Sequence, residues 1–122
     1  MDKELFRVII SENQEYIGNI PLIERPLDLE ASGNYVFVGV RQAGKSYLLY
    51  QRVRQMLKQG TRLEDIVYIN FDDERLLGMT SDDFDLILQA YHSMYDGNPV
   101  FFFDEIQNVD GWANFARRLA NR

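Results

Sequence analysis

Apolar residues recur along this chain with two different periods, which predict helices and short strands in turn. Helical spacing is found around residues 3–19, 47–59, 84–95 and 112–120. Apolar runs without that spacing, at residues 35–38, 66–71 and 100–103, are typical of strands. Helices that alternate with buried strands favour an α/β fold, with a parallel sheet flanked by helices.

The first 34 residues are predicted to form a helix and an extended connector, and residues 35–122 the core. Asp2 is expected to cap this helix, and Gly18 and Asn19 to end it. Its apolar face is predicted to consist of Leu5, Val8, Ile9, Tyr16, Ile17 and Ile20. Two prolines at positions 21 and 26 exclude a helix interior there.

The later helices carry end signals as well. Gly60 is placed to end the second helix, and Thr61 and Glu64 are predicted to form a capping box after it. Thr80 or Ser81 is expected to cap the third helix. One face of the second helix is basic, which suits contact with nucleic acid or a partner, although a solvated face is the favoured interpretation. This face consists of Arg52, Arg54 and Lys58.

A glycine-rich stretch joins the first predicted strand to the second helix and matches the pattern G-x-x-x-x-G-K-S. Its residues are Gly39, Val40, Arg41, Gln42, Ala43, Gly44, Lys45 and Ser46. Glycines let backbone N–H groups turn toward phosphate oxygens, and the next helix adds its positive dipole end. Lys45 is expected to reach the β- and γ-phosphates, and Ser46 to offer its hydroxyl to Mg²⁺. Together with Tyr47 these residues are predicted to bind a nucleotide; a glycine-rich turn before a helix is the alternative.

The last predicted strand ends in two acids. Four large apolar residues in a row, at 100–103, are typical of a strand buried on both faces, and Asp104 and Glu105 follow at once. We expect Asp104 to meet the hydrated Mg²⁺ near Ser46, and Glu105 to deprotonate the water that attacks the γ-phosphate. The alternative is that both acids cap the next turn, and the phosphate loop upstream favours the catalytic interpretation.

A second acidic group follows the strand of residues 66–71. Asp72, Asp73 and Glu74 would lie at the edge where parallel sheets bind ligands. A place on the Mg²⁺ side of a nucleotide site and a role as solvated acids or a helix cap are equally compatible with this position.

The composition restricts the number of domains, the kinds of metal site and the cellular location that we expect. With 122 residues, 46% of them hydrophobic, the chain forms one globular domain at most. It has no cysteine, which excludes disulfides and thiolate metal sites. Because no run is long enough to span a bilayer and the N-terminus does not resemble a signal peptide, we expect a cytoplasmic location and no membrane partner. The net charge of −6 argues against direct nucleic-acid binding by general electrostatics.

Three motifs in this order resemble one family. The phosphate loop, residues 69–76 and residues 103–112 together resemble the amino-terminal half of a prokaryotic AAA-type ATPase family, described as archaeal-like or AAA-14-like. The resemblance implies a P-loop NTPase core with Lys45 and Ser46 in the Walker A motif. It places Asp104 in the Walker B motif and Glu105 at the catalytic position. It also implies ATP as the substrate and Mg²⁺ as the cofactor.

The resemblance further implies a fourth and a fifth core strand, which cannot be placed in this sequence, so the chain is expected to be an amino-terminal fragment. In the family's architecture the fourth strand separates the phosphate-loop strand from the Asp104 strand. The fragment would then have a slot in its sheet. We expect it to repack the sheet or to associate with another copy, because open strand edges favour pairing.

Three functions are compatible with these motifs. The first is Mg²⁺-dependent ATP hydrolysis by the parent protein; the absence of an Asn-Lys-x-Asp motif favours ATP over GTP, and whether the fragment itself is an enzyme stays open. The second is a nucleotide-dependent protein-interaction module with little or no turnover. The third is a small-molecule kinase, in which the phosphate-loop strand usually neighbours the Walker B strand directly. A scaffold that binds no nucleotide is a further alternative.

Overall fold

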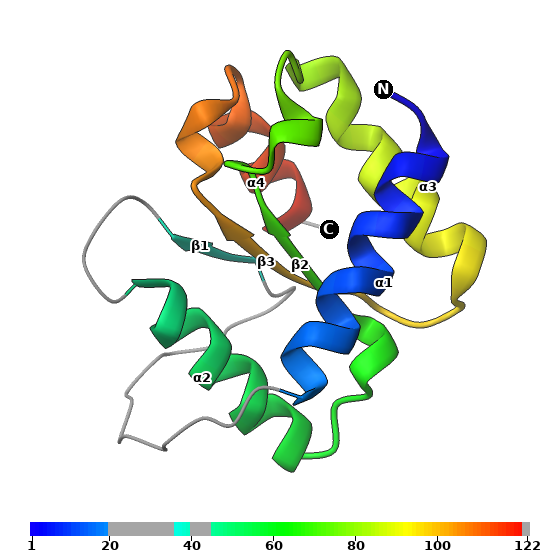
Figure 1. Cartoon of the computed structure of the whole chain (residues 1–122), viewed down its shortest axis with the longest axis vertical. Coiled ribbons are helices and arrows are strands. Elements are labelled where there is room, and N and C mark those ends of the chain that lie inside the picture. The colour runs from blue at the N-terminus through cyan, green and yellow to red at the C-terminus, as the bar shows by residue number, and fades with distance from the viewer. Residues whose placement is uncertain (20–35, 40–44, 121–122) are drawn as a thin grey trace.

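The computed structural model describes residues 1–19, 36–39 and 45–120. Within these residues four helices alternate with three strands (Figure 1). In chain order they are α1 (Lys3–Asn19), β1 (Val36–Gly39), α2 (Lys45–Lys58), β2 (Ile66–Asn70), α3 (Phe84–Met94), β3 (Val100–Asp104) and α4 (Trp112–Ala120). Short 3₁₀ turns connect several of them. The predicted proline-containing connector lies outside the described residues.

The three strands form one parallel sheet in the order β1-β3-β2. Strand β3 is in the centre and all five of its residues are buried. This confirms that an uninterrupted apolar run marks a strand covered on both faces. The arrowheads in Figure 1 point to one end of the sheet, so the residues that follow the strands gather at that end.

Two apolar clusters cover the two faces of the sheet. Because successive side chains alternate between faces, Tyr68 and Phe102 pack with helix α2. Ile69 and Phe103, one position further along, pack with α3, α4 and the first half of α1. The fold is therefore an α/β arrangement of a parallel sheet between helical layers, as expected for an incomplete P-loop NTPase core.

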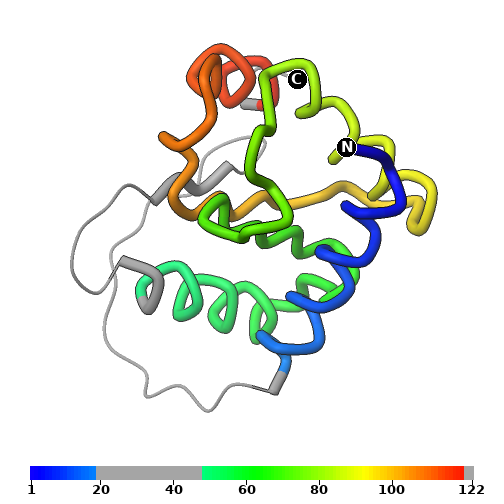
Figure 2. Tube along the Cα trace, turned by 45° about the horizontal axis from the view of Figure 1, so that its top comes forward, coloured from blue at the N-terminus to red at the C-terminus, as the bar shows by residue number. Residues whose placement is uncertain are grey.

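Helix α1 crosses from one layer to the other along the outer side of β2. Phe6 and Ile9 belong to the cluster around α3, whereas Ile17 belongs to the cluster around α2. Figure 2 shows the end of this helix beside α2. The buried Gln14 lies between these positions, and its Nε2 donates hydrogen bonds to the backbone oxygens of Glu64 (3.1 Å) and Ile66 (3.0 Å). Helix α1 thus covers the edge of β2 and satisfies part of its backbone.

Several predicted helix ends are confirmed. The Asp2 carboxylate accepts a hydrogen bond of 2.9 Å from the backbone N–H of Leu5. Gly60 follows α2 with a φ of 104°, and the N–H of Thr61 bonds back to the oxygen of Met56 at 3.0 Å. These contacts satisfy backbone groups that a helix end leaves without an intrahelical partner.

Three local predictions are wrong. The capping box of Thr61 and Glu64 does not form, because the short turn before β2 has Arg62 at its N-cap and Glu64 is ion-paired to Arg62 at 2.7 Å. Val8 and Tyr16 of α1 are exposed, since the helix turns Phe6 and Gln14 inward instead. Arg52, assigned to a solvated face, is buried, and its guanidinium donates to the side chain of Gln55.

The sheet has no slot between the phosphate-loop strand and the Asp104 strand among the residues described. Strand β1 pairs directly with β3, with Gly39 opposite Asp104. This is the repacked arrangement expected of a segment without an intervening strand. It is also the order that the kinase hypothesis predicts, so strand order alone does not separate the two interpretations.

Candidate functional site

The two chemical motifs meet at the carboxyl end of the sheet. Gly39 begins the phosphate-loop motif and is the last residue of β1, where its partner in the ladder is Asp104. Lys45, Ser46 and Tyr47 form the first turn of α2, with helical backbone. The motif residues 40–44, which are Val40, Arg41, Gln42, Ala43 and Gly44, lie outside the described residues. Both described ends of the motif are thus placed on elements that pack with β3.

Asp104 is fully buried at the end of β3. Its Oδ2 accepts a hydrogen bond of 2.7 Å from the hydroxyl of Tyr68 on the neighbouring strand β2. Since Tyr68 stands opposite Phe102 in the ladder, Asp104 lies on the sheet face that α2 covers. A buried carboxylate is costly without polar partners, so this tyrosine compensates part of the cost.

Three neighbouring tyrosine rings extend from α1 toward this carboxylate. The rings of Tyr50 and Tyr68 are 5.0 Å apart, and the ring of Tyr16 lies 6.2 Å from that of Tyr50. Burial, followed by the hydrogen bond to Asp104, raises the pKa of Tyr68 far above its usual range. Burial also raises the pKa of Tyr50. The Tyr68 hydroxyl therefore stays protonated and acts as a donor toward Asp104.

Glu105 lies in a left-handed backbone conformation directly after β3. Its φ of 56° and ψ of 34° are uncommon for a residue with a side chain. Only 9% of its surface is exposed, and its Oε2 accepts a hydrogen bond of 2.6 Å from the Nε2 of Gln107. The turn therefore fixes both the backbone and the carboxylate of the predicted general base.

The acids that follow β2 have structural partners. Asp73 is the N-cap of a short 3₁₀ turn, where its side chain accepts from the N–H of Arg75. The ion pair with Arg75, at 2.7 Å, lowers the pKa of Asp73, and Arg75 also pairs with Glu12 of α1 at 2.8 Å. Asp72 is exposed and accepts a hydrogen bond from Asn108, in the turn after Glu105. The helix-cap alternative thus accounts for Asp73, and Asp72 joins the two loops at this end of the sheet.

Three residues of this site were not predicted from the sequence. Tyr68, Gln107 and Asn108 make the side-chain hydrogen bonds to Asp104, Glu105 and Asp72, respectively. One signal for Tyr68 was available: it carries the only hydroxyl in this strand, two residues before its end. The pairing of β2 with β3 was needed to show which acid it meets.

The donor set suits a magnesium ion bound together with a nucleotide. The described residues contain no group of three or more His, Cys, Asp or Glu side chains that could hold a metal by themselves. Mg²⁺ is usually held by one or two carboxylates together with waters and substrate phosphates, so one buried carboxylate and a bound nucleotide can supply its ligands. Asp104 and the hydroxyl of Ser46 are the residues that would hold it.

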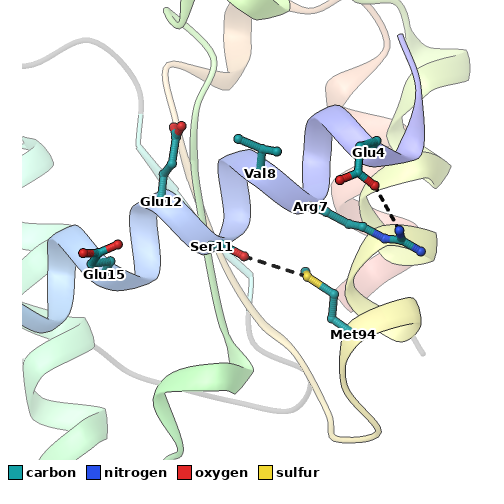
Figure 3. A pocket seen from close by; sticks show the side chains of 7 residues that line it. All are labelled: Glu4, Arg7, Val8, Ser11, Glu12, Glu15 and Met94. Atoms are coloured by element: carbon teal, nitrogen blue, oxygen red, sulfur yellow. Dashed lines mark hydrogen bonds and ion pairs between the residues drawn. The ribbon is translucent and has the colours of Figure 1, made fainter.

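A separate pocket opens on the surface of α1 and α3, as Figure 3 shows. It measures about 380 Å³, and its lining includes Glu4, Glu12 and Glu15. Arg7 in the same pocket pairs with Glu4 at 3.0 Å and donates to Ser93. The pocket is built by helices other than α2, so it is distinct from the site around Asp104.

In the part of the chain that the structure describes, no helix is both long enough and apolar enough to cross a membrane.

The fold is consistent with an incomplete P-loop NTPase core, and comparison with known proteins shows the family. The family model AAA_14, described as an AAA domain, matches residues 32–122, and the chain belongs to this family. The family is one of nucleotide-binding domains of the ATPase type. Helix α1 precedes the matched residues.

Two relatives extend the comparison. An uncharacterized protein of Methanocaldococcus jannaschii is 37% identical over 119 residues, which cover 96% of this chain and 26% of the relative. An uncharacterized protein of Haemophilus influenzae is 35% identical over 85 residues, or 69% of this chain and 21% of that protein. The chain thus spans about a quarter or less of the length of these relatives. No solved structure matches it.

Family membership decides between the two interpretations of the strand order. A direct β1-β3 pairing fits a small-molecule kinase, but the chain belongs to the AAA_14 family. The pairing is therefore best explained as the arrangement that this segment adopts without a strand between β1 and β3.

Proposed function

We propose that this segment binds Mg-ATP and that the parent protein hydrolyses it. The observation that carries the proposal is the ladder pair of Gly39 and Asp104, which brings the start of the phosphate loop and a buried acid to one point. Glu105 is the next residue, so a general base lies beside the metal-side acid. Family membership supports a nucleotide as the ligand.

Each residue has a distinct role in this proposal. Backbone N–H groups of the phosphate loop and the first turn of α2 bind phosphate oxygens, and Lys45 adds positive charge to the β- and γ-phosphates. Ser46 and Asp104 hold Mg²⁺, which supplies neutralising charge to the phosphates. Glu105 accepts the proton of the attacking water. A parent protein in the cytoplasm, where Mg-ATP is abundant, suits these roles.

Calorimetric titration of Mg-ATP into the chain, beside the variant Lys45→Ala, tests the binding step. We expect binding that weakens at least tenfold in Lys45→Ala, because hydrogen bonds to charged groups contribute about 1.5–3 kcal/mol. Lys58→Ala removes a lysine from the exposed end of the same helix and should bind like the unmodified chain. At 100 times the dissociation constant, ATP should stabilise the chain by about 2.7 kcal/mol in a melting experiment. Absence of binding would contradict the proposal for this segment.

The alternative is an interaction module that holds ATP with little turnover. Glu105→Gln in the parent protein separates the two, because loss of a general base typically slows hydrolysis by about 10² to 10⁴. Under the hydrolysis proposal the variant binds ATP and traps it, whereas under the alternative the variant and the parent retain ATP equally long. Retention of radiolabelled ATP on the purified proteins measures the difference.

A further inference from the structure

We propose that Tyr68 is a positioning residue for Asp104, holding its carboxylate in the orientation that receives Mg²⁺ beside the nucleotide. This rests on the proposed function of the site. The Tyr68 hydroxyl and Asp104 Oδ2 are 2.7 Å apart, and both side chains are buried, with exposed fractions of 1% and 0%. In such surroundings a hydrogen bond is strong and directional, so it restricts rotation of the carboxylate.

The sheet determines which acid the tyrosine meets. Tyr68 is aligned with Phe102 in the ladder between β2 and β3, and Asp104 lies two residues further on the same face. The hydroxyl therefore reaches diagonally across the sheet to the end of the central strand. Asn70, the direct ladder partner of Asp104, uses its own side chain to accept the N–H of Asp72.

Helix α2 fixes the tyrosine ring from the other side. The ring of Tyr50, on α2, lies 5.0 Å from that of Tyr68 at an interplanar angle of 34°. Both rings belong to or pack against the apolar cluster of α2, together with Phe102. Because α2 begins with Lys45 and Ser46, one helix carries phosphate-binding residues and also supports the donor to Asp104. Helix α2 thus helps to position both Asp104, through Tyr68, and the phosphate-binding residues Lys45 and Ser46.

A purely structural role would also explain a hydrogen bond to a buried carboxylate, so the test must separate folding from metal binding. The quantity to measure is the ratio of ATP affinities with Mg²⁺ and with EDTA. ATP binding in EDTA depends on the phosphate loop alone and reports whether the fold is intact. The ratio reports the contribution of Mg²⁺ and hence of Asp104.

Tyr68→Phe removes one hydroxyl and keeps the ring. The expected result is unchanged affinity for ATP in EDTA and a Mg²⁺ contribution about tenfold smaller, since residues that orient a ligating group typically contribute 10–100-fold to metal affinity. Tyr91→Phe is the matched control, because Tyr91 is also buried and its hydroxyl donates to a carboxylate, that of Asp65, outside the site. This control should leave the ratio unchanged.

The other outcomes are decisive as well. An unchanged ratio in Tyr68→Phe overturns the positioning role while the proposed function stands. Loss of ATP binding in EDTA by Tyr68→Phe assigns Tyr68 to folding alone and also overturns it. Absence of Mg-ATP binding by the unmodified chain overturns the proposed function and this inference together. In the background Asp104→Asn, the further change Tyr68→Phe should not alter the ratio, since the two residues act as one unit.

Discussion

At the scale of single residues, the position after Asp104 combines an unfavourable backbone with the side chain that we propose as the general base. Glu105 has a φ of 56°, a region that costs a residue with a Cβ about 1 kcal/mol. The turn that follows and the hydrogen bond from Gln107 hold it there. Strain of this kind is retained where a side chain must project from a tight turn, which agrees with a catalytic role for Glu105.

The backbone cost at this position can be measured. We expect Glu105→Gly to be more stable than Glu105→Ala by about 1 kcal/mol in denaturant unfolding, because only glycine adopts a positive φ without a steric penalty. At Gln107, in the short turn that follows, the order should reverse, with Gln107→Ala more stable than Gln107→Gly. Equal stabilities of the two Glu105 variants would show that the left-handed conformation is absent in solution.

At the scale of elements, α1 stabilises an edge that would otherwise be open. Among the described strands β2 pairs only with β3, and on its other side the amide of Gln14 binds the backbone oxygens of Glu64 and Ile66. The hydroxyl of Tyr95 in turn donates to Oε1 of Gln14 at 3.2 Å. A helix that lies before the residues of the AAA match thus covers one edge of the sheet of the AAA domain.

Removal of this amide should destabilise the chain more than removal of a surface amide. Gln14→Ala leaves two backbone acceptors without their donor, which typically costs about 1–3 kcal/mol. Gln89→Ala, at an exposed position of α3, should change the free energy of unfolding by no more than about 0.5 kcal/mol. Urea unfolding of the two variants measures both values. Equal effects would contradict the assignment of α1 as the cover of β2.

Most elements could be predicted from the sequence, because their apolar period and end residues are local signals. The helix that begins near Phe84 and the strand that ends at Asp104 are examples. Local signals failed where a distant partner decides the outcome. Gln14 turns inward because the edge of a distant strand needs a donor. No pattern within one helix or turn contains that information.

At the scale of the whole molecule, the strand order and the partners of the candidate site residues could not be predicted from the sequence. The motifs around Gly39 and Asp104 could be found, but their direct pairing depends on which strands are available to the sheet. Tyr68 could be identified as a partner of Asp104 only once the register of β2 against β3 was fixed. The sequence therefore proposes candidate chemical groups for the site but does not identify the residues that orient them.

The last prediction concerns association of this chain. Among the described strands, β1 pairs only with β3, so no described strand is paired to its outer edge. The outer edge of β2, in contrast, is covered by α1. An edge with unpaired backbone groups is a template for another strand, so we expect two copies to associate through β1. Sedimentation over a hundredfold range of concentration should show a mass that rises toward a dimer. Leu77→Asp removes the most exposed large apolar side chain of the described residues, at 79%, and should leave this association unchanged. A monomer at every concentration would show that the outer edge of β1 is protected.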